Sequence, residues 1–242
     1  MQSIAIITDI HGNAAALEAV LKDISGRGLR KIYCLGDVVA IGPDTDRVFE
    51  LLLAQEGITF ISGNHDIALL RAFRGEEPPP GNHAEREHHE WLAQRISPQY
   101  IELMSTWPMT ATASIEDVPM LFTHYHLDED GWYMPVDWSP SSEGLNQLYA
   151  DTEYGLVAFG HHHVVHHFQG VKATFFNPGA LGCAHSELPV AKYGIVTVES
   201  GRVYAESVDI AYDNSGFLRS YERLGVPDKD TILRIFHGRA SH

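Results

Sequence analysis

The chain has 242 residues, of which 44% are hydrophobic and 20% are charged. This length and composition predict one domain, or one domain with an insertion, around a sizeable core, and they exclude a disordered chain. Two cysteines are too few for a disulfide scaffold, and a net charge of −15 disfavours general binding to nucleic acids or to anionic membranes. The 15 histidines are the unusual feature, and they make metal chemistry the first hypothesis to test.

The N-terminal sequence MQSIAIITDIHG has no basic segment, and its apolar run at 4–7 is far shorter than the core of a signal peptide. No stretch approaches the ~20 apolar residues that span a membrane. Cys34 lies in an apolar run, where a buried free thiol is expected, whereas the environment of Cys183 is less clear. We therefore expect residues 1–242 to form a single cytoplasmic domain.

The first half of the chain alternates short apolar runs with amphipathic segments. Strands are predicted at 4–7, 32–35 and 58–61, and helices at 13–24 and 44–54. Asn13 precedes the first amphipathic segment and is an expected helix N-cap. This alternation favours an α/β fold with a parallel sheet that is covered on both faces.

A polar break at 76–81 separates this half from the rest, and we expect a helical insertion or cap over 74–107. Its helices are predicted at 83–95 and 98–105. An aromatic segment without periodicity at 131–142 is expected to be a loop. Strands are predicted at 110–114, 118–122, 156–159, 164–168, 173–176, 193–198 and 202–208. The C-terminal region, 211–242, is predicted to hold two helices, at 215–224 and 228–236.

Metal-binding side chains follow several of the predicted strands directly. They come after the apolar runs at 4–7, 32–35, 58–61, 120–122 and 156–159, and they are Asp9, His11, Asp37, Asn64, His124, His161 and His163. Ligands of open α/β sheets bind beyond the carboxyl ends of the strands, so these groups are expected to converge in one crevice. Taken alone, each residue also has a structural explanation as a turn, a cap or a buried histidine.

A cluster of this kind implies cations, because burying an uncompensated carboxylate costs several kcal/mol. The ligands are too many for one tetrahedral ion and suit two ions that share a carboxylate. Such a pair, about 3.5–4 Å apart, is used for phosphoryl displacement. Imidazole and oxygen donors without thiolate favour Mn²⁺, Fe or Zn²⁺ over Ca²⁺.

These residues form a motif string that resembles the calcineurin-like metallophosphoesterase superfamily, especially its small bacterial phosphodiesterases and phosphatases. In chain order the motifs are Asp9-Ile10-His11, Gly36-Asp37, Gly63-Asn64-His65-Asp66, His124 and Gly160-His161-His162-His163, followed by Asn177-Pro178-Gly179. The resemblance implies a two-sheet β sandwich flanked by helices. It also implies that one ion binds Asp9, His11, Asp37 and His163, and the other Asp37, Asn64, His124 and His161.

In this resemblance Asp37 bridges the two ions. His65 is not implied to be a ligand and takes the position that polarises the phosphate or protonates the leaving oxygen. The hypothesis is hydrolysis of a small phosphate ester by hydroxide that forms from water between the ions. General acid catalysis by a residue such as His65 is typically worth 10²–10⁴-fold, so we regard His65 as the candidate catalytic residue.

The chain departs from the Ser/Thr protein phosphatases in its phosphate-binding residues. Ala40 and Ile41 stand where those enzymes carry Asp and Arg, and Ser62 stands where they carry a second Arg. Because a bidentate arginine is a strong phosphate binder, its loss disfavours a protein phosphatase. It equally disfavours a dinucleoside polyphosphate hydrolase, whose members share the Arg pattern.

We expect a small phosphorylated substrate, with phosphodiester, phosphomonoester and nucleotide all open. Asn13, Arg71, Arg74 and His126 are candidate substrate contacts, although Asn13 also suits an N-cap and the arginines suit a solvated helix face. The non-enzymatic alternative is a metal-free binding or scaffold module of the same fold.

Overall fold

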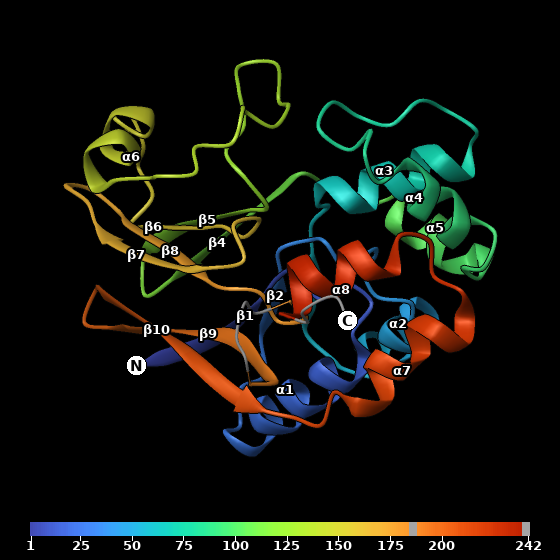
Figure 1. Cartoon of the computed structure of the whole chain (residues 1–242). Coiled ribbons are helices and arrows are strands. Elements are labelled where there is room, and N and C mark those ends of the chain that lie inside the picture. Colours follow the sequence, from blue (N-terminus) through green and yellow to red (C-terminus); the bar gives the residue numbers. More distant parts are fainter. Residues whose placement is uncertain (184–187, 239–242) are drawn as a thin grey trace.

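The computed structural model describes residues 1–183 and 188–238, and two β-sheets form its centre (Figure 1). The first sheet has the order β10-β9-β1-β2-β3 and comprises β1 (Gln2–Ile7), β2 (Ile32–Cys34), β3 (Ile58–Phe60), β9 (Val190–Glu199) and β10 (Arg202–Ala211). The second has the order β4-β5-β6-β8-β7 and comprises β4 (Thr110–Ile115), β5 (Val118–Thr123), β6 (Leu156–Ala158), β7 (Val165–Gln169) and β8 (Thr174–Pro178).

Helices flank both sheets (Figure 1). They are α1 (Ala14–Gly26), α2 (Thr45–Leu53), α3 (Asn64–Phe73), α4 (Arg86–Ala93), α5 (Pro98–Met104), α6 (Ser142–Leu148), α7 (Ser215–Leu224) and α8 (Lys229–His237). Across the ranges 1–183 and 188–238, none of these helices is long and apolar enough to cross a membrane. The two-sheet core with its flanking helices confirms the predicted fold class.

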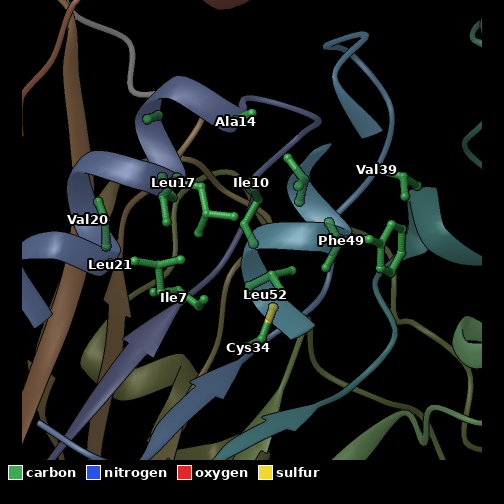
Figure 2. Close-up of a cluster of buried hydrophobic side chains, with 14 of the residues drawn as sticks. Ile7, Ile10, Ala14, Leu17, Val20, Leu21, Cys34, Val39, Phe49 and Leu52 are labelled. Atoms are coloured by element: carbon green, nitrogen blue, oxygen red, sulfur yellow. The ribbon is translucent and has the colours of Figure 1, made fainter. Parts of the chain in front are cut away.

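β1 is apolar from Ile4 to Ile7 because both of its faces are covered there. Ile4 and Ile6 pack toward the second sheet, in a cluster that includes Phe122. Ala5 and Ile7 face the opposite way and belong to the cluster that contains Leu17, Val20 and Leu21 of α1 (Figure 2). A strand buried on both sides reads as a continuous apolar run, which is why the alternation typical of a half-exposed strand is missing here.

The strands that lead to the metal-binding side chains are divided between the two sheets. β1, β2 and β3 run parallel in the first sheet, and β5 and β6 run parallel in the second. The sequence suggested neighbouring strands of one open sheet, and the structure corrects this: three of the strands belong to one sheet and two to the other. Because strand ends of both sheets meet at one edge, the side chains still converge.

Two helices were not predicted. α3 begins within the Gly63-Asn64-His65-Asp66 motif, with Gly63 as N-cap, so its first residues read as site residues rather than as a helix. α6 buries only Leu145 and therefore carries no apolar periodicity. The insertion over 74–107 holds α4 and α5, and α4 begins three residues later than predicted because residues 83–85 form a turn.

The inner faces of the two sheets are joined by aromatic stacking. The rings of Tyr33 in β2 and Phe122 in β5 lie 3.8 Å apart, centroid to centroid, at an interplanar angle of 7°. Phe122 is fully buried.

We predict that Phe122→Ala lowers the free energy of unfolding by about 3–5 kcal/mol, because it removes this stack and leaves a cavity between the sheets. Urea denaturation measures the change. Val171→Ala is the control, since Val171 is 88% exposed and its truncation should change stability by no more than about 0.5 kcal/mol. Equal stability of the two variants would contradict a tightly packed interface.

Candidate metal centre

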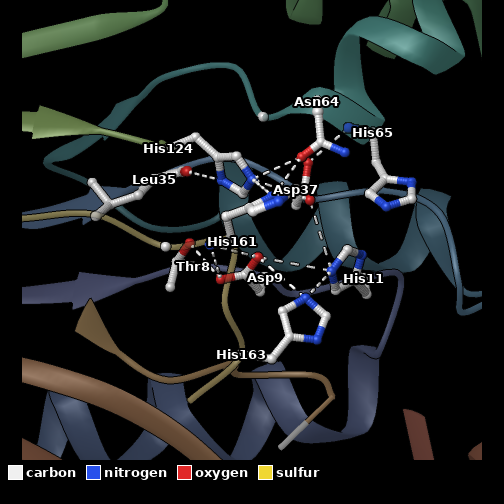
Figure 3. A network of polar contacts seen from close by, with 12 residues as sticks. Thr8, Asp9, His11, Leu35, Asp37, Asn64, His65, His124, His161 and His163 are labelled. Carbon is white, nitrogen blue, oxygen red and sulfur yellow. Dashed lines mark hydrogen bonds and ion pairs between the residues drawn. The ribbon is translucent and has the colours of Figure 1, made fainter. Parts of the chain in front are cut away.

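The loops that follow β1, β2, β3, β5 and β6 bring the sequence-predicted ligands to one place (Figure 3). The side chains that meet there are those of Asp9, His11, Asp37, Asn64, His124, His161 and His163. Residues separated by more than 150 positions in the chain are thus within hydrogen-bonding distance, as His11 and His163 illustrate.

The first group of ligand atoms consists of Asp9, His11 and His163. The Nε2 atoms of the two histidines lie 3.0 Å apart, and Nε2 of His163 lies 3.4 Å from Oδ1 of Asp9. All ligand atoms of this group are within 4.8 Å of one another. Two imidazole nitrogens and a carboxylate oxygen that point at one spot are a donor set for a transition metal.

The second group consists of Asp37, His124 and His161, with Asn64 beside them. Oδ1 of Asn64 lies 3.0 Å from Nε2 of His124 and 2.9 Å from Nδ1 of His161. The ligand atoms of the two histidines and Asp37 are again within 4.8 Å of one another. This group mixes two ring nitrogens with carboxylate and amide oxygens.

Asp37 lies between the groups. Its Oδ2 atom is 3.2 Å from Nε2 of His124 and 3.8 Å from Nε2 of His11. A single carboxylate is therefore within reach of both groups, as a shared ligand must be.

Backbone carbonyls orient two of the histidines. Nδ1 of His124 lies 2.8 Å from the carbonyl of Leu35, and Nδ1 of His11 lies 3.1 Å from the carbonyl of Val39. A carbonyl only accepts, so each Nδ1 carries a proton and each Nε2 is the ring nitrogen that faces the centre. This outer hydrogen bond is characteristic of metal-ligating histidines.

Asp9 and Asp37 are buried and ionised. Burial alone would raise the pKa of each carboxyl group, but the neighbouring histidines outweigh it, His163 acting mainly on Asp9 and His124 on Asp37, and both pKa values lie well below the usual range. In the ranges that the structure describes, the ion-pair partners of these carboxylates are histidines and not lysine or arginine. Buried negative charge without such partners is the electrostatic signature of a cation site.

The pKa values of the histidines in the centre are shifted in different directions. Burial lowers the pKa values of His11 and His161 to about 4, so both are neutral near pH 7 and have free lone pairs. Burial would also lower the pKa of His124, but Asp37 and Asp9 outweigh it and raise it to about 9. The proton of His124 thus occupies the position in which a metal ion would compensate the same carboxylates.

The backbone of the ligand loops lies in the left-handed region, which residues other than glycine seldom adopt. The φ angles are +54° for Asp9, +49° for His11, +49° for Asp37, +69° for His161 and +59° for His163. Such conformations persist only where the surrounding structure enforces them, and they cluster at functional sites.

Asp66 provides part of that enforcement, a role that its place in the motif did not predict. Its Oδ2 atom accepts from the backbone N–H groups of Asp37, at 2.8 Å, and of Gly63, at 2.9 Å. Its Oδ1 atom accepts from Val38 at 3.0 Å. Burial and the neighbouring Asp37 raise the pKa of Asp66 to about 7. This carboxyl group ties the loop of Asp37 to the start of α3.

Gly63 allows the two loops to approach closely. A Cβ atom at this position would lie 2.1 Å from Oδ1 of Asp37, a contact that no side chain can make. The Asn177-Pro178-Gly179 segment supports the centre from behind, because Nδ2 of Asn177 donates to the carbonyl of Gly160 at 2.6 Å. We therefore interpret Asn177-Pro178-Gly179 as a segment that supports the loop after β6, and not as one that contacts substrate through its backbone.

His65 lies in the first turn of α3, and its ring centroid is 5.2 Å from that of His11. Its Nδ1 atom is 3.0 Å from Nε2 of His89, which belongs to α4 of the insertion. Burial lowers the pKa of His65 well below its usual value. Sequence analysis did not identify His89, and the histidine-rich character of the predicted helix at 83–95 was the only available signal.

A cleft of about 630 Å³ opens over the second group. Asn64, His65 and His161 lie at its inner end. Pro80, Gly81, Asn82 and Glu85 line one side, and the segment after β5 lines the other with Tyr125, Tyr133, Met134, Pro135, Val136 and Trp138. An ester bound at the metal centre would extend into this cleft.

The four candidate substrate contacts, Asn13, Arg71, Arg74 and His126, lie outside the lining of the cleft. Asn13 is fully buried, where Oδ1 accepts from the N–H of Ala16 and caps α1, and Nδ2 donates to Gly182 and Tyr212. Arg71 lies 6.0 Å from the ring of Trp132 and donates to the carbonyl of Glu77. His126 is buried against the hydroxyl of Tyr149.

Comparison with known proteins agrees with this geometry. The family model of the calcineurin-like phosphoesterase superfamily domain matches residues 2–201. The chain belongs to the calcineurin-like phosphoesterase superfamily. Its members are hydrolytic metallophosphoesterases that use divalent metal ions.

The chain of this phosphoesterase is also similar to individual proteins. An uncharacterized protein of Methanocaldococcus jannaschii is 28% identical over 239 residues, which is 91% of each chain. The symmetrical bis(5'-nucleosyl)-tetraphosphatase of Cronobacter sakazakii is 28% identical over 173 residues, 59% of this chain and 60% of that enzyme. The crystal structure of a metallophosphoesterase from Sphaerobacter thermophilus shares the fold, with a TM-score of 0.73, 21% identity and coverage of 98% of both chains.

We predict that the purified phosphoesterase binds two metal ions and that Asp37→Asn lowers this content to one or fewer. The substitution replaces a charged ligand that faces both groups with a neutral amide. Elemental analysis of protein purified with Mn²⁺ measures the content. Asp151→Asn, which changes an exposed carboxylate outside both ligand groups, is the control and should retain the content of the wild type. Two ions in Asp37→Asn would contradict the shared role of Asp37.

Proposed function

We propose that this phosphoesterase hydrolyses a small phosphate ester, a diester or a monoester, by direct attack of water at a dinuclear metal centre. The observation that carries the proposal is the pair of ligand groups that flank Asp37 at the inner end of a cleft. When bound, the metal ions lower the pKa of water and neutralise charge on the phosphoryl oxygens. The nitrogen and oxygen donors suit Mn²⁺, Fe or Zn²⁺.

In this proposal Asp37 is shared by both ions. Asp9, His11 and His163 complete one site, and Asn64, His124 and His161 complete the other. The left-handed backbone of Asp9, His11, Asp37, His161 and His163 supports preorganisation, because their positions are set before substrate arrives. No serine or cysteine nucleophile is required, and both cysteines are buried free thiols, which supports our assignment to a reducing cytoplasm.

We propose that His65 protonates the leaving group. The attacking water gives up one proton; as its oxygen bonds to phosphorus, the ester P–O bond breaks and the departing oxygen takes up one proton. Burial keeps His65 neutral in the free protein, and an anionic phosphate bound beside it favours the imidazolium that delivers this proton. His65 lines the cleft beside Asn64. His89 contacts its Nδ1 atom, so Nε2 remains as the ring nitrogen that can serve the leaving oxygen. His89 acts in this scheme as a positioning residue.

Hydrolysis of dinucleoside polyphosphates is the second candidate, and the similarity to the Cronobacter sakazakii enzyme favours it. Three residues argue against it. Ala40, Ile41 and Ser62 stand at the positions of the Arg pattern that binds phosphate in such hydrolases, and none of them is an arginine. The same positions argue against a protein phosphatase. The complete ligand set argues against a metal-free scaffold, and the net charge of −15 argues against a nuclease.

We predict hydrolysis of bis(p-nitrophenyl) phosphate in the presence of Mn²⁺ and its loss with a chelator. His65→Ala should lower kcat by about 10²–10⁴-fold and retain the metal content, because the residue serves the leaving oxygen without binding a metal ion. Steady-state kinetics and elemental analysis measure the two effects. No chelator-sensitive hydrolysis of bis(p-nitrophenyl) phosphate or of p-nitrophenyl phosphate by the wild type would overturn the proposed activity, and an unchanged kcat in His65→Ala would remove the role of His65.

We predict that His89→Leu lowers kcat by about five- to tenfold at unchanged KM and metal content, which corresponds to the loss of one hydrogen bond. His89→Gln should restore part of kcat, since its amide can still contact His65. His88→Leu is the matched control, because His88 is also buried in α4 and its ring nitrogens have no hydrogen-bond partner among the described residues. Equal effects of His88→Leu and His89→Leu on kcat would indicate a merely structural role.

A further inference from the structure

We infer that the cleft selects esters whose organic group is planar, aromatic and free of negative charge, and that it disfavours substrates with additional phosphate groups. The inference rests on the proposed function, because it concerns the part of the substrate that lies beyond the phosphoryl group. Three features of the lining carry it: an aromatic wall, an unsatisfied acceptor and the absence of cationic side chains.

The aromatic wall begins directly beside a metal-ligand candidate. The ring of Trp138 is 6.3 Å from the ring of His161, and that of Tyr125 is 5.2 Å from it. Trp138 is nevertheless 75% exposed. An indole of this exposure at the mouth of a cleft is a surface on which a planar group can stack.

Hydrogen bonds hold this wall in place. The hydroxyl of Tyr133 donates to the carbonyl of Ser62 at 2.6 Å, and the N–H of Asp137 donates to the hydroxyl of Tyr125 at 2.8 Å. The first bond connects the segment after β5 to the loop after β3. The second bond joins two residues within the segment after β5 and so fixes its conformation. A preformed wall loses little conformational entropy when a ligand binds.

The opposite wall offers hydrogen-bond acceptors. Oε2 of Glu85 is buried and has no partner among the described residues. Asn82, which is 4% exposed, accepts from Nδ2 of Asn64 at 3.5 Å. A buried acceptor without a partner is costly, and an N–H or O–H group of a ligand would remove that cost.

The charge of the lining sets the limit on the substrate. Within the described part of the chain the lining contains the carboxylate of Glu85 and no lysine or arginine. Arg71 is engaged with Trp132 and the carbonyl of Glu77, outside the lining. A second or third phosphate would therefore face a carboxylate with no cation to balance it, whereas a neutral or cationic aromatic group would not.

Binding of phosphonates to the Mn²⁺-loaded protein tests the inference without depending on turnover. Methylphosphonate and phenylphosphonate share the phosphonate group that mimics the phosphoryl group, and they differ in the organic group, which is a methyl group in one and an aromatic ring in the other. Calorimetry should give phenylphosphonate an affinity about tenfold higher, as expected for one stacked ring. Trp138→Ala should reduce this ratio to about two or less. Trp132→Ala is the matched control, because Trp132 is exposed on the same segment but outside the lining, and it should retain the ratio.

A charged probe tests the limit on negative charge. Para-carboxyphenylphosphonate should bind about tenfold more weakly than phenylphosphonate. Glu85→Gln should remove most of that difference, and Glu87→Gln, exposed on α4 outside the lining, should leave it unchanged. Equal affinities of methylphosphonate and phenylphosphonate, or a ratio that survives Trp138→Ala, would overturn the aromatic part. Equal affinities of the carboxylated and unsubstituted rings would overturn the charge part.

The outcomes separate this inference from the proposed function. Hydrolysis of bis(p-nitrophenyl) phosphate without any preference for phenylphosphonate would overturn the inferred selectivity and leave the activity intact. Preference for phenylphosphonate that depends on Trp138, without hydrolysis, would support the selectivity and overturn the proposed activity.

Discussion

Two buried carboxylates, Asp9 and Asp37, set the electrostatic constraint around which the molecule is organised. Each remains ionised between the sheets because histidines surround it. The hydrogen bonds of Leu35 and Val39 orient those histidines, and Asp66 and Gly63 bring the loops close enough for the groups to meet. The fold thus concentrates negative charge and lone pairs at one point, and divalent cations are the natural complement of such a point.

The convergence of the candidate ligands was predictable from sequence because each of them follows a buried strand closely. Strand ends are local features, and the motif order adds specificity that no single residue has. The partition of those strands between two sheets was not predictable, because an apolar run such as residues 4–7 is equally compatible with cover by a helix or by another sheet. α3 escaped prediction because its first turn consists of polar site residues rather than a periodic apolar face.

The contributions of the insertion were the least predictable. His89 and Glu85 lie near the site only because α4 folds back against α3, and such a tertiary contact has no signature in the local pattern. The same applies to Asn13 and His126, whose side chains could have faced substrate but satisfy internal partners instead. Sequence analysis predicted which candidate ligands converge better than it predicted which residues line the cleft beside them.

Both ligand groups draw their members from both sheets. Asp9 and His11 follow a strand of the first sheet, whereas His163 follows one of the second, and the pairing of Asp37 with His124 and His161 repeats this division. A bound ion would therefore act as a crosslink between the two layers of the sandwich. Sliding of one layer over the other, or a change in their twist, would stretch both coordination spheres at once. Binding of ions at the centre would for this reason make the packing of the two sheets more rigid.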